Sequence, residues 1–459
     1  ITFNQKIKAG SGNITLREDS ASGTVVENFG IGSSVTISGN SLSMTPTSNL
    51  SELQTYHLSY PSGVITNMAG ESYVGTAYTF KAFGYNYELW MWGRGNNGSG
   101  GGGGLGQNNT TSYSSPVQVP GTTWRKVRTS NYQSSTLAVK TDGTLWSWGY
   151  NEYGMLGLNN EGINVSSPVQ IPGTTWKDID AHYMMRSATK TDGTFWIWGD
   201  NIGYGVLAWP GGPVNAVSSP VQVPGTTWDR PVSMYSVRGG IKTDNTLWLW
   251  GNNRYGNLAQ NNSGSPANHG ISSPVQVPGT WSNFSGTTQT ALGVKTDGTL
   301  WTWGNNHTGD FGIPSIADQD SRSSPVQIPG TWSSIISKGY RSTAALKTDG
   351  TLWTWGSNTE GTLGQNDRTD RSSPVQVPGT TWDFLTCTHG RAFFATKTDG
   401  TLWSWGFNEH GRLGHNNTVR YSSPVQIPGT DWLNEDGYWG NKGIGGGAAS
   451  IGVIKRVTP

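Results

Sequence analysis

The chain has 459 residues, of which 66 are Gly and 23 are Trp, while only 13% are charged and the net charge is +1. This length allows two or three ordinary domains, and the near-neutral charge argues against nucleic acid or an anionic membrane as partner. No apolar run is long enough to span a bilayer, and the single cysteine, Cys387, allows no disulfide within the chain.

Residues 1–82 alternate apolar and polar side chains between Gly, Ser and Asn turns, which is typical of β-strands. The segments AGSGNITL (9–16) and YHLSYPSGVITNMAGESYVG (56–75) resemble the bacterial Ig-like domain of S-layer and adhesin proteins. That family often has Asp before an Ala-Gly pair, whereas this chain has Asn67 and Met68. The resemblance implies a small β-sandwich over residues 1–82, followed by a junction at 83–86. The opening ITFNQK is typical of mid-strand sequence, so we expect a truncated first strand and a piece of a longer polypeptide.

Two sequence elements recur seven times from residue 87 to the end of the chain. The element W-x-W-G begins at positions 90, 146, 196, 248, 301, 353 and 403, at intervals of 50 to 56 residues. The element SSPVQ(V/I)PG lies between successive copies, and one further Trp follows each of its copies. Together these elements hold 21 of the 23 tryptophans, so we interpret the tryptophans as parts of a repeating structure.

Within each repeat, a run such as LAVK-TDG-TLWSW predicts a β-hairpin closed by an Asp-Gly turn. The fourth repeat has Asp244-Asn245 at this place. Because Asn tolerates a positive φ better than other non-glycine residues, this exception supports the turn.

One repeat alone would leave both faces of a small sheet exposed, and a ring of repeats would bury those faces against each other. We therefore expect the paired tryptophans to fill the space between adjacent blades of a propeller. They are Trp90, Trp92, Trp146, Trp148, Trp196, Trp198, Trp248, Trp250, Trp301, Trp303, Trp353, Trp355, Trp403 and Trp405.

The two ends of the repeat array complement each other. The first W-x-W-G has no KTDG strand before it, and the segment SIGVIK (450–455) has no W-x-W-G after it. We expect these ends to form one shared closing blade. The predicted fold is therefore all-β: a seven-bladed β-propeller over residues 87–459, preceded by the small Ig-like β-sandwich.

The pattern K-T-D-G-T-L-W-x-W-G-x-N-x-x-G-x-L-G resembles the repeat of the regulator of chromosome condensation family. Asn151, Gly154, Leu156 and Gly157 carry it after Trp148. The resemblance covers residues 87–459 and implies a seven-bladed propeller. It is a weak guide to function, because members include a nucleotide-exchange factor, an enzyme inhibitor and a photoreceptor. What the members share is binding on a propeller face.

Catalytic and cofactor motifs give no support for an enzyme. The segment GRGNNG (93–98) matches G-x-G-x-x-G but leads into SGGGGGLG rather than a helix, so it lacks the dinucleotide fingerprint. The seven histidines show no metal-ligand spacing, and the acidic groups complete no calcium loop. We expect no catalytic residue, no metal and no cofactor, although carboxylates could still meet across a propeller face.

Strand sequences are nearly copied between repeats, whereas two sets of loops vary. One set joins W-x-W-G to SSPVQ, and the other follows the Trp after Pro-Gly and includes Tyr183 and Tyr235. Variable loops on uniform strands are typical of a recognition scaffold, although simple sequence drift explains them too. The candidate recognition residues are Tyr153, Tyr204, Trp209, Arg254, Phe311, His410, Arg412, Tyr340, Arg341, His389, Tyr438 and Trp439.

These features favour a non-enzymatic structural protein of a virion or bacterial surface, such as a phage tail fibre, a decoration protein or an adhesin. Its expected location is extracellular, and its expected partners are a host surface glycan or protein, or other virion or surface-layer subunits. Nucleic acid binding and membrane insertion are not expected. A soluble protein-binding or inhibitor module is the alternative, and a carbohydrate-active enzyme is a third hypothesis.

Overall fold

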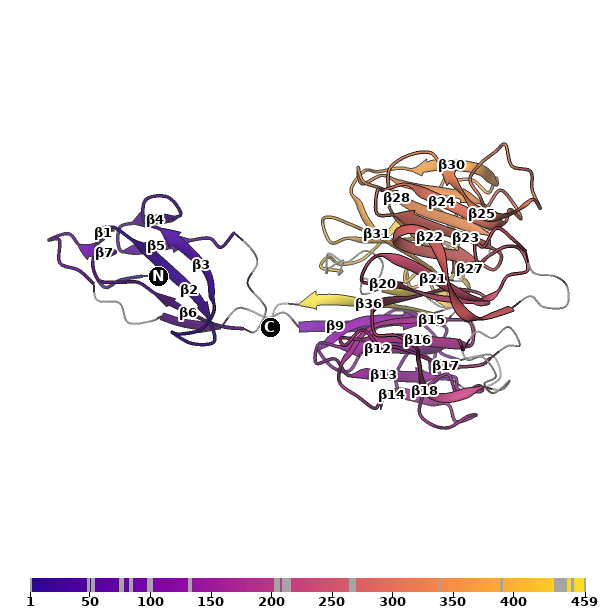
Figure 1. The fold of residues 1–459 in the computed structure, drawn as a ribbon, viewed down its shortest axis with the longest axis horizontal. Coiled ribbons are helices and arrows are strands. Elements are labelled where there is room, and N and C mark those ends of the chain that lie inside the picture. Colours follow the sequence, from indigo (N-terminus) through magenta and orange to yellow (C-terminus); the bar gives the residue numbers. More distant parts are fainter. Residues whose placement is uncertain are drawn as a thin grey trace. The chain divides into compact units, whose positions relative to one another are not determined.

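A computed structural model describes residues 2–47, 50, 54–73, 78–81, 86–96, 102–130, 134–201, 207–208, 216–263, 270–336, 338–339, 341–388, 391–432, 444–446 and 450–457. The chain divides between Asn86 and Tyr87 into two compact units (Figure 1). In the described ranges the single helix is a 3-10 turn, η1 (Glu409–Gly411), and no helix is long and apolar enough to cross a membrane. The all-β prediction is confirmed.

The N-terminal unit is a small β structure with one apolar core. Its main sheet has the order β3 (Val25–Gly30), β2 (Asn13–Glu18), β6 (Thr55–Ser59) and β8 (Tyr78–Lys81). Two strand pairs accompany it: β4 (Val35–Ser38) with β5 (Ser41–Met44), and β1 (Ile7–Ala9) with β7 (Ile65–Asn67). Alternate residues point inward along each strand, so Ile14 and Leu16 of β2 are buried together with Tyr56 and Leu58 of β6.

The second unit is built from antiparallel sheets that follow the repeats. Four of these sheets have four strands each: β11 (Trp124–Thr129), β12 (Ser135–Lys140), β13 (Leu145–Gly149), β14 (Val165–Ile171); β15 (Trp176–His182), β16 (Met185–Lys190), β17 (Phe195–Gly199), β18 (Val217–Val223); β26 (Trp332–Ile336), β28 (Ser342–Lys347), β29 (Leu352–Gly356), β30 (Arg371–Val377); β31 (Trp382–Thr388), β32 (Ala392–Lys397), β33 (Leu402–Gly406), β34 (Tyr421–Ile427).

A larger sheet lies between them in the chain. It runs through β19 (Trp228–Met234), β20 (Val237–Lys242), β21 (Thr246–Asn252), β22 (Gly270–Thr287), β23 (Thr290–Lys295), β24 (Leu300–Asn305) and β25 (Ser321–Ile328), with β27 (Lys338–Gly339) pairing to β22. The long strand β22 is the last strand of one repeat and the first strand of the next, so this sheet contains two blades.

The remaining sheet joins the two ends of the unit. Its order is β10 (Tyr113–Val119), β9 (Asn86–Gly93), β36 (Ser450–Val457) and β35 (Ile444–Gly446). Figure 1 shows yellow β36 beside purple β9. The shared closing blade is therefore present, and with β22 counted twice the described strands form seven groups of four.

The second tryptophan of each W-x-W-G is fully buried between blades, with an exposed fraction of 0% from Trp92 through Trp405. In six of the seven its indole N–H donates to a loop carbonyl of the preceding blade, as from Trp148 to Gly104 at 2.9 Å and from Trp198 to Met155 at 3.0 Å. The same contact closes the ring, because Trp92 donates to the carbonyl of Arg412 at 2.8 Å.

The first tryptophan of each pair is only half-buried and lies two residues before the second, nearer the start of the strand. In the six repeats that have the hairpin turn, its indole N–H donates to a turn threonine, whose hydroxyl donates in turn to the turn aspartate, whereas Trp90 donates to the carboxylate of Glu88 at 3.1 Å. Trp196, Thr194 and Asp192 form one such chain, with distances of 2.9 and 2.7 Å. These hydrogen bonds from Thr194 lower the pKa of Asp192.

The hairpin turns adopt the predicted left-handed backbone, with φ of 78° at Gly193 and 65° at Asn245. Each turn carbonyl also accepts the backbone N–H of the buried Trp that begins the next blade. A Cβ on Gly193 would lie 2.0 Å from the carbonyl oxygen of Thr226. Thr226 belongs to a PGTTW linker, whereas the linkers that face Asn245 and Gly298 read PGTW. The shorter linker leaves room for a side chain.

This geometry predicts that Asn is tolerated at the turn position of Gly298 and not at that of Gly193. Gly193→Asn should lower the free energy of unfolding by about 2 kcal/mol or more, because its Cβ meets a backbone oxygen that cannot move away. Gly298→Asn should cost about 1 kcal/mol or less, because φ is a similar 82° but the nearest atom to its Cβ is 3.6 Å away. Denaturant titration of both variants measures the difference, and equal losses would contradict the linker explanation.

Candidate functional site

Both variable loop sets lie on one face of the propeller. In each blade the first strand runs from the Pro-Gly linker to an inner loop, and the third strand runs in the same direction to the long loop before SSPVQ. Backbone hydrogen bonds join the two loops, as from Tyr150 N to Ser134 O at 3.0 Å and from Asn252 N to Ser236 O at 2.9 Å. We call this side the loop face and the opposite side, with the Asp-Gly turns and Pro-Gly linkers, the turn face.

Two tyrosines of neighbouring inner loops on the loop face make a tilted ring contact, with an interplanar angle of 51°. The rings of Tyr183 and Tyr235 have centroids 4.4 Å apart, and both residues are half-buried. Tyr183 has a positive φ of 52°, and its carbonyl accepts a 2.6 Å hydrogen bond from the Ser130 hydroxyl of the preceding blade. Tyr183 is therefore held by contacts with the blades on both sides of its own, through Ser130 and Tyr235.

Two fully buried arginines support these loops from below. Arg186 is 1% exposed and donates to the carbonyls of Tyr183 and Met185 at 3.2 and 2.7 Å. Arg238, also 1% exposed, donates to the carbonyl of His182 at 3.0 Å. Burial lowers the pKa of Arg186 to about 9 and that of Arg238 to about 10. These hydrogen bonds from planar guanidinium groups anchor the backbone of both loops.

The first strands of three neighbouring blades meet in a buried charged cluster. Lys126 of β11 forms a 3.3 Å ion pair with Asp178 of β15, and the Ser233 hydroxyl of β19 donates to Asp180. Burial lowers the pKa of Lys126, and the neighbouring Asp178 opposes this shift. We use the name loop-face platform for Tyr183 and Tyr235 together with the buried polar groups that support their loops. These groups are Arg186, Arg238, the Lys126–Asp178 pair and the Ser233–Asp180 pair. The platform's arginines, Arg186 and Arg238, are not among the residues predicted from the sequence, although MRSATK and VRGGIK depart from STLAVK at that position.

The described candidate residues differ in their surroundings. Arg254 is exposed and its guanidinium lies 5.4 Å from the ring of Tyr255, while Tyr153, His410 and Arg341 are half-buried. Burial lowers the pKa of His410. Phe311 is instead fully buried, because it takes the core position that Leu156 holds in its own repeat.

Arg412 is also unavailable to a partner, with an exposed fraction of 4%. Its guanidinium packs 4.8 Å from the ring of Phe407, and its carbonyl holds Trp92. Six further candidates lie outside the described residues: Tyr204, Trp209, Tyr340, His389, Tyr438 and Trp439.

Family models match both units. The model of the regulator of chromosome condensation (RCC1) repeat matches residues 142–183, 349–385 and 399–432, a second model of the same repeat matches 335–362, and a bacterial Ig-like domain model matches 1–83. The chain carries RCC1 repeats and a bacterial Ig-like domain.

Curated relatives of the RCC1 repeats cover only part of the chain. A protein RCC2 homolog of Danio rerio is 36% identical over 117 residues, which are 25% of this chain and 22% of that protein. The ultraviolet-B receptor UVR8 of Arabidopsis thaliana is 26% identical over 251 residues, or 52% of this chain and 54% of the receptor. The chain thus spans about half or less of the relatives it matches.

Solved RCC1-type structures confirm the fold. Human WBSCR16 aligns with a TM-score of 0.67 and 16% identity, covering 81% of this chain and all of that one. Yeast RCC1 (Prp20), in its complex with Kap60, gives 0.67 and 18% identity, covering 82% and 90%. At this identity the likeness shows the fold alone.

The Asn that recurs in the RCC1 pattern has a structural role in this chain. Asn151 is fully buried, its Oδ1 accepts the backbone N–H of Leu156 at 3.0 Å, and its amide donates to Asn160. Asn253, Asn306, Asn358 and Asn408 hold their loops in the same way. The motif therefore fixes loop shape and leaves recognition to the residues around it.

One buried carboxyl in an RCC1 loop has an unusual pKa. Asp310 is 1% exposed, and burial raises its pKa to about 6 although the hydroxyls of Thr308 and Thr290 donate to it at 3.1 and 3.3 Å. A raised carboxyl pKa is a feature of general acids. Because this group has almost no contact with solvent, we interpret it as part of the contact between blades.

Asp310 predicts a pH-dependent stability. Its folded-state pKa lies above the usual 3.8, so its favourable contribution is complete below about pH 4 and is lost as the pH rises through 6. Asp310→Asn should therefore raise the free energy of unfolding by roughly 3 kcal/mol at pH 8, at 1.36 kcal/mol per unit, with little change near pH 4. Denaturant titrations of both proteins at several pH values test this; a difference that does not vary with pH would refute it.

Proposed function

We propose that this chain is a non-enzymatic attachment protein of a bacterial or virion surface, in which the Ig-like domain carries a propeller that recognises its target through the loop face. This includes a phage tail fibre, a decoration protein or a bacterial adhesin. The proposed partners are a host surface glycan or protein, or other subunits of the particle or surface layer.

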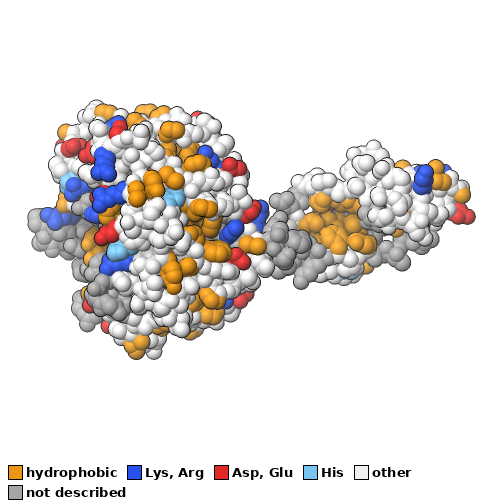
Figure 2. All heavy atoms as spheres, turned by 180° about the vertical axis from the view of Figure 1, so that it is seen from behind, with side chains coloured by type: hydrophobic (Ala, Val, Ile, Leu, Met, Phe, Trp, Pro, Cys, Tyr) orange, Lys and Arg blue, Asp and Glu red, His pale blue; other side chains and the backbone are white. Residues whose placement is uncertain are grey.

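The loop-face platform is the observation that carries the proposal. Aromatic side chains held rigid by buried polar contacts lose little freedom on binding and are enriched where binding energy concentrates. The N-terminal domain supports an extracellular setting, because its matching family is a bacterial Ig-like domain. The charge distribution supports it too: on the face that Figure 2 draws, Lys and Arg lie among Asp and Glu rather than in one basic patch of the kind that nucleic acid requires.

A soluble protein-binding module is the second candidate. It is supported by the related structures, since one is yeast RCC1 bound to Kap60 and another study concerns the binding of Prp20p to Gsp1p and histones. The third hypothesis, a carbohydrate-active enzyme, has less support, because Asp310, whose pKa is raised to about 6, is buried between blades, Asp200 is the only other described carboxyl whose pKa burial raises, and the described residues hold no cluster of three metal-ligating groups.

Binding to intact cells or particles tests the attachment role. Labelled protein should bind a subset of a panel of bacterial strains, and Tyr183→Ser with Tyr235→Ser should weaken that binding at least tenfold, as expected for central aromatic contacts. Val169→Ser on β14 is the matched control, because Val169 is 37% exposed on an outermost strand and away from the platform.

The outcomes separate the candidate functions. Binding to cells or particles that depends on the tyrosine pair supports attachment. A single stoichiometric soluble partner, with no surface binding, supports the protein-binding module instead. Turnover of a bound glycan would refute the non-enzymatic proposal.

A further inference from the structure

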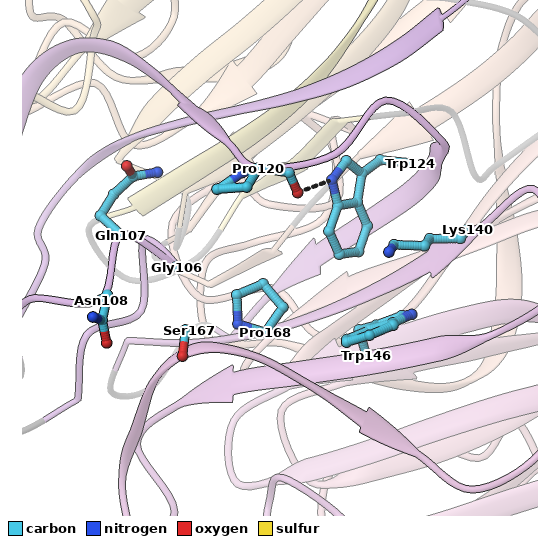
Figure 3. Close-up of a pocket in the computed structure, with 9 residues that line it drawn as sticks. All are labelled: Gly106, Gln107, Asn108, Pro120, Trp124, Lys140, Trp146, Ser167 and Pro168. Carbon is cyan, nitrogen blue, oxygen red and sulfur yellow. Dashed lines mark hydrogen bonds between the residues drawn. The ribbon is translucent and has the colours of Figure 1, made fainter.

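A pocket of about 340 Å³ opens between the closing blade and the blade that follows it (Figure 3). The long loop and the linker of the closing blade contribute Gly106, Gln107, Asn108 and Pro120. The next blade contributes Trp124, Lys140, Trp146, Ser167 and Pro168. The volume lies within the range of small-molecule sites, about 300–1,000 Å³.

Two indoles and an ammonium group form one side of the pocket. Lys140 Nζ lies 4.7 Å from the ring of Trp124 and 4.2 Å from that of Trp146, and the two rings meet edge to face with centroids 6.1 Å apart. Trp146 is half-buried, so part of its ring remains accessible. Within the described residues the ammonium makes no hydrogen bond, which leaves its donors available.

An amide and a hydroxyl form the opposite side, as Figure 3 shows for Asn108 and Ser167. At three equivalent blade contacts the corresponding groups bond to each other: Ser219 to Asn159 at 3.1 Å, Ser324 to Asn261 at 2.9 Å and Ser423 to Asn366 at 3.3 Å. Asn108 and Ser167 form no side-chain hydrogen bond with a described residue. In this pocket the amide and the hydroxyl are therefore available to a ligand, whereas at the three other blade contacts they are hydrogen-bonded to each other.

The lining restricts the chemistry of an occupant. A cationic ligand would suit two indoles alone, but the Lys140 ammonium already occupies that position and would repel it. The remaining features are an accessible aromatic surface and separate hydroxyl, amide and ammonium groups that can donate to oxygens. These features match a ring with one C–H-rich face and several hydroxyls.

We infer that this pocket binds one pyranose residue of a surface glycan, with the sugar ring against Trp146 and its hydroxyls on Asn108, Ser167 and Lys140. The inference rests on the proposed attachment function and gives it a ligand class. It also adds a binding position on the outer part of a blade contact, separate from the loop-face platform.

Titration of the full chain with methyl glycosides of common hexoses, N-acetylhexosamines and hexuronic acids tests the inference. Saturation-transfer NMR and calorimetry should detect at least one of these sugars, with a stoichiometry of one per chain. The variant Asn108→Gly with Ser167→Ala should weaken binding at least tenfold with an unchanged melting temperature. Gly is chosen because Asn108 has a positive φ of 56°, which Gly adopts without strain.

The matched control is Asn366→Gly with Ser423→Ala, which removes a bonded pair at another blade contact and should leave sugar binding unchanged. Sugar binding that survives the Asn108 and Ser167 changes, or no binding of any glycoside at millimolar concentration, would overturn the inference. If cells bind without any glycoside binding, the inference fails and the proposed function stands. If a glycoside binds in this pocket but no cell or particle does, the proposed function fails and the sugar site remains.

Discussion

One hydrogen-bonded indole between each pair of blades determines the rest of this propeller. The second Trp of W-x-W-G fills the space between two sheets and donates to a loop carbonyl of the preceding blade. In five of the seven repeats a Gly lies against the ring, and a Cβ on Gly157 would lie 2.8 Å from the Trp198 Nε1. Ala208 and Ala259 take this position in the other two repeats, likewise with a positive φ. A bulky ring on one side and a Gly or Ala on the other therefore form one contact, which explains why W-x-W-G and G-x-L-(G/A) recur together.

This constraint leaves few positions free to vary. Strand residues must fit the neighbour on each side, so a change in one repeat requires a matching change in the next. The pairing of Asn245 with a shortened PGTW linker is one such compensation. Arg186 and Arg238 are another kind of departure, because each places a fully buried guanidinium at a strand position where the other described repeats have no charged residue. Burying a charged residue costs desolvation free energy. Residues that break the repeat pattern at this cost, without improving the packing, are expected near a binding site.

The sequence was sufficient for the fold but not for the loop-face platform. The repeats, the Asp-Gly hairpins and the complementary ends are local patterns, and they predict the strands, the left-handed Asn245 and the shared closing sheet. The platform depends on contacts between residues about 50 positions apart, such as Ser130 with Tyr183, which no local pattern encodes. Phe311 illustrates the opposite error, since an aromatic in a variable loop is fully buried when it replaces the leucine of the motif.

The closing sheet also determines how the propeller responds to mechanical load. The first strand of the propeller, β9, is hydrogen-bonded on one side to β10 and on the other to β36. A pull directed along the axis of β9 would slide this strand past two partners at once instead of peeling one edge open. Rupture would require many hydrogen bonds to break together, and a tether to a moving surface benefits from such shear resistance.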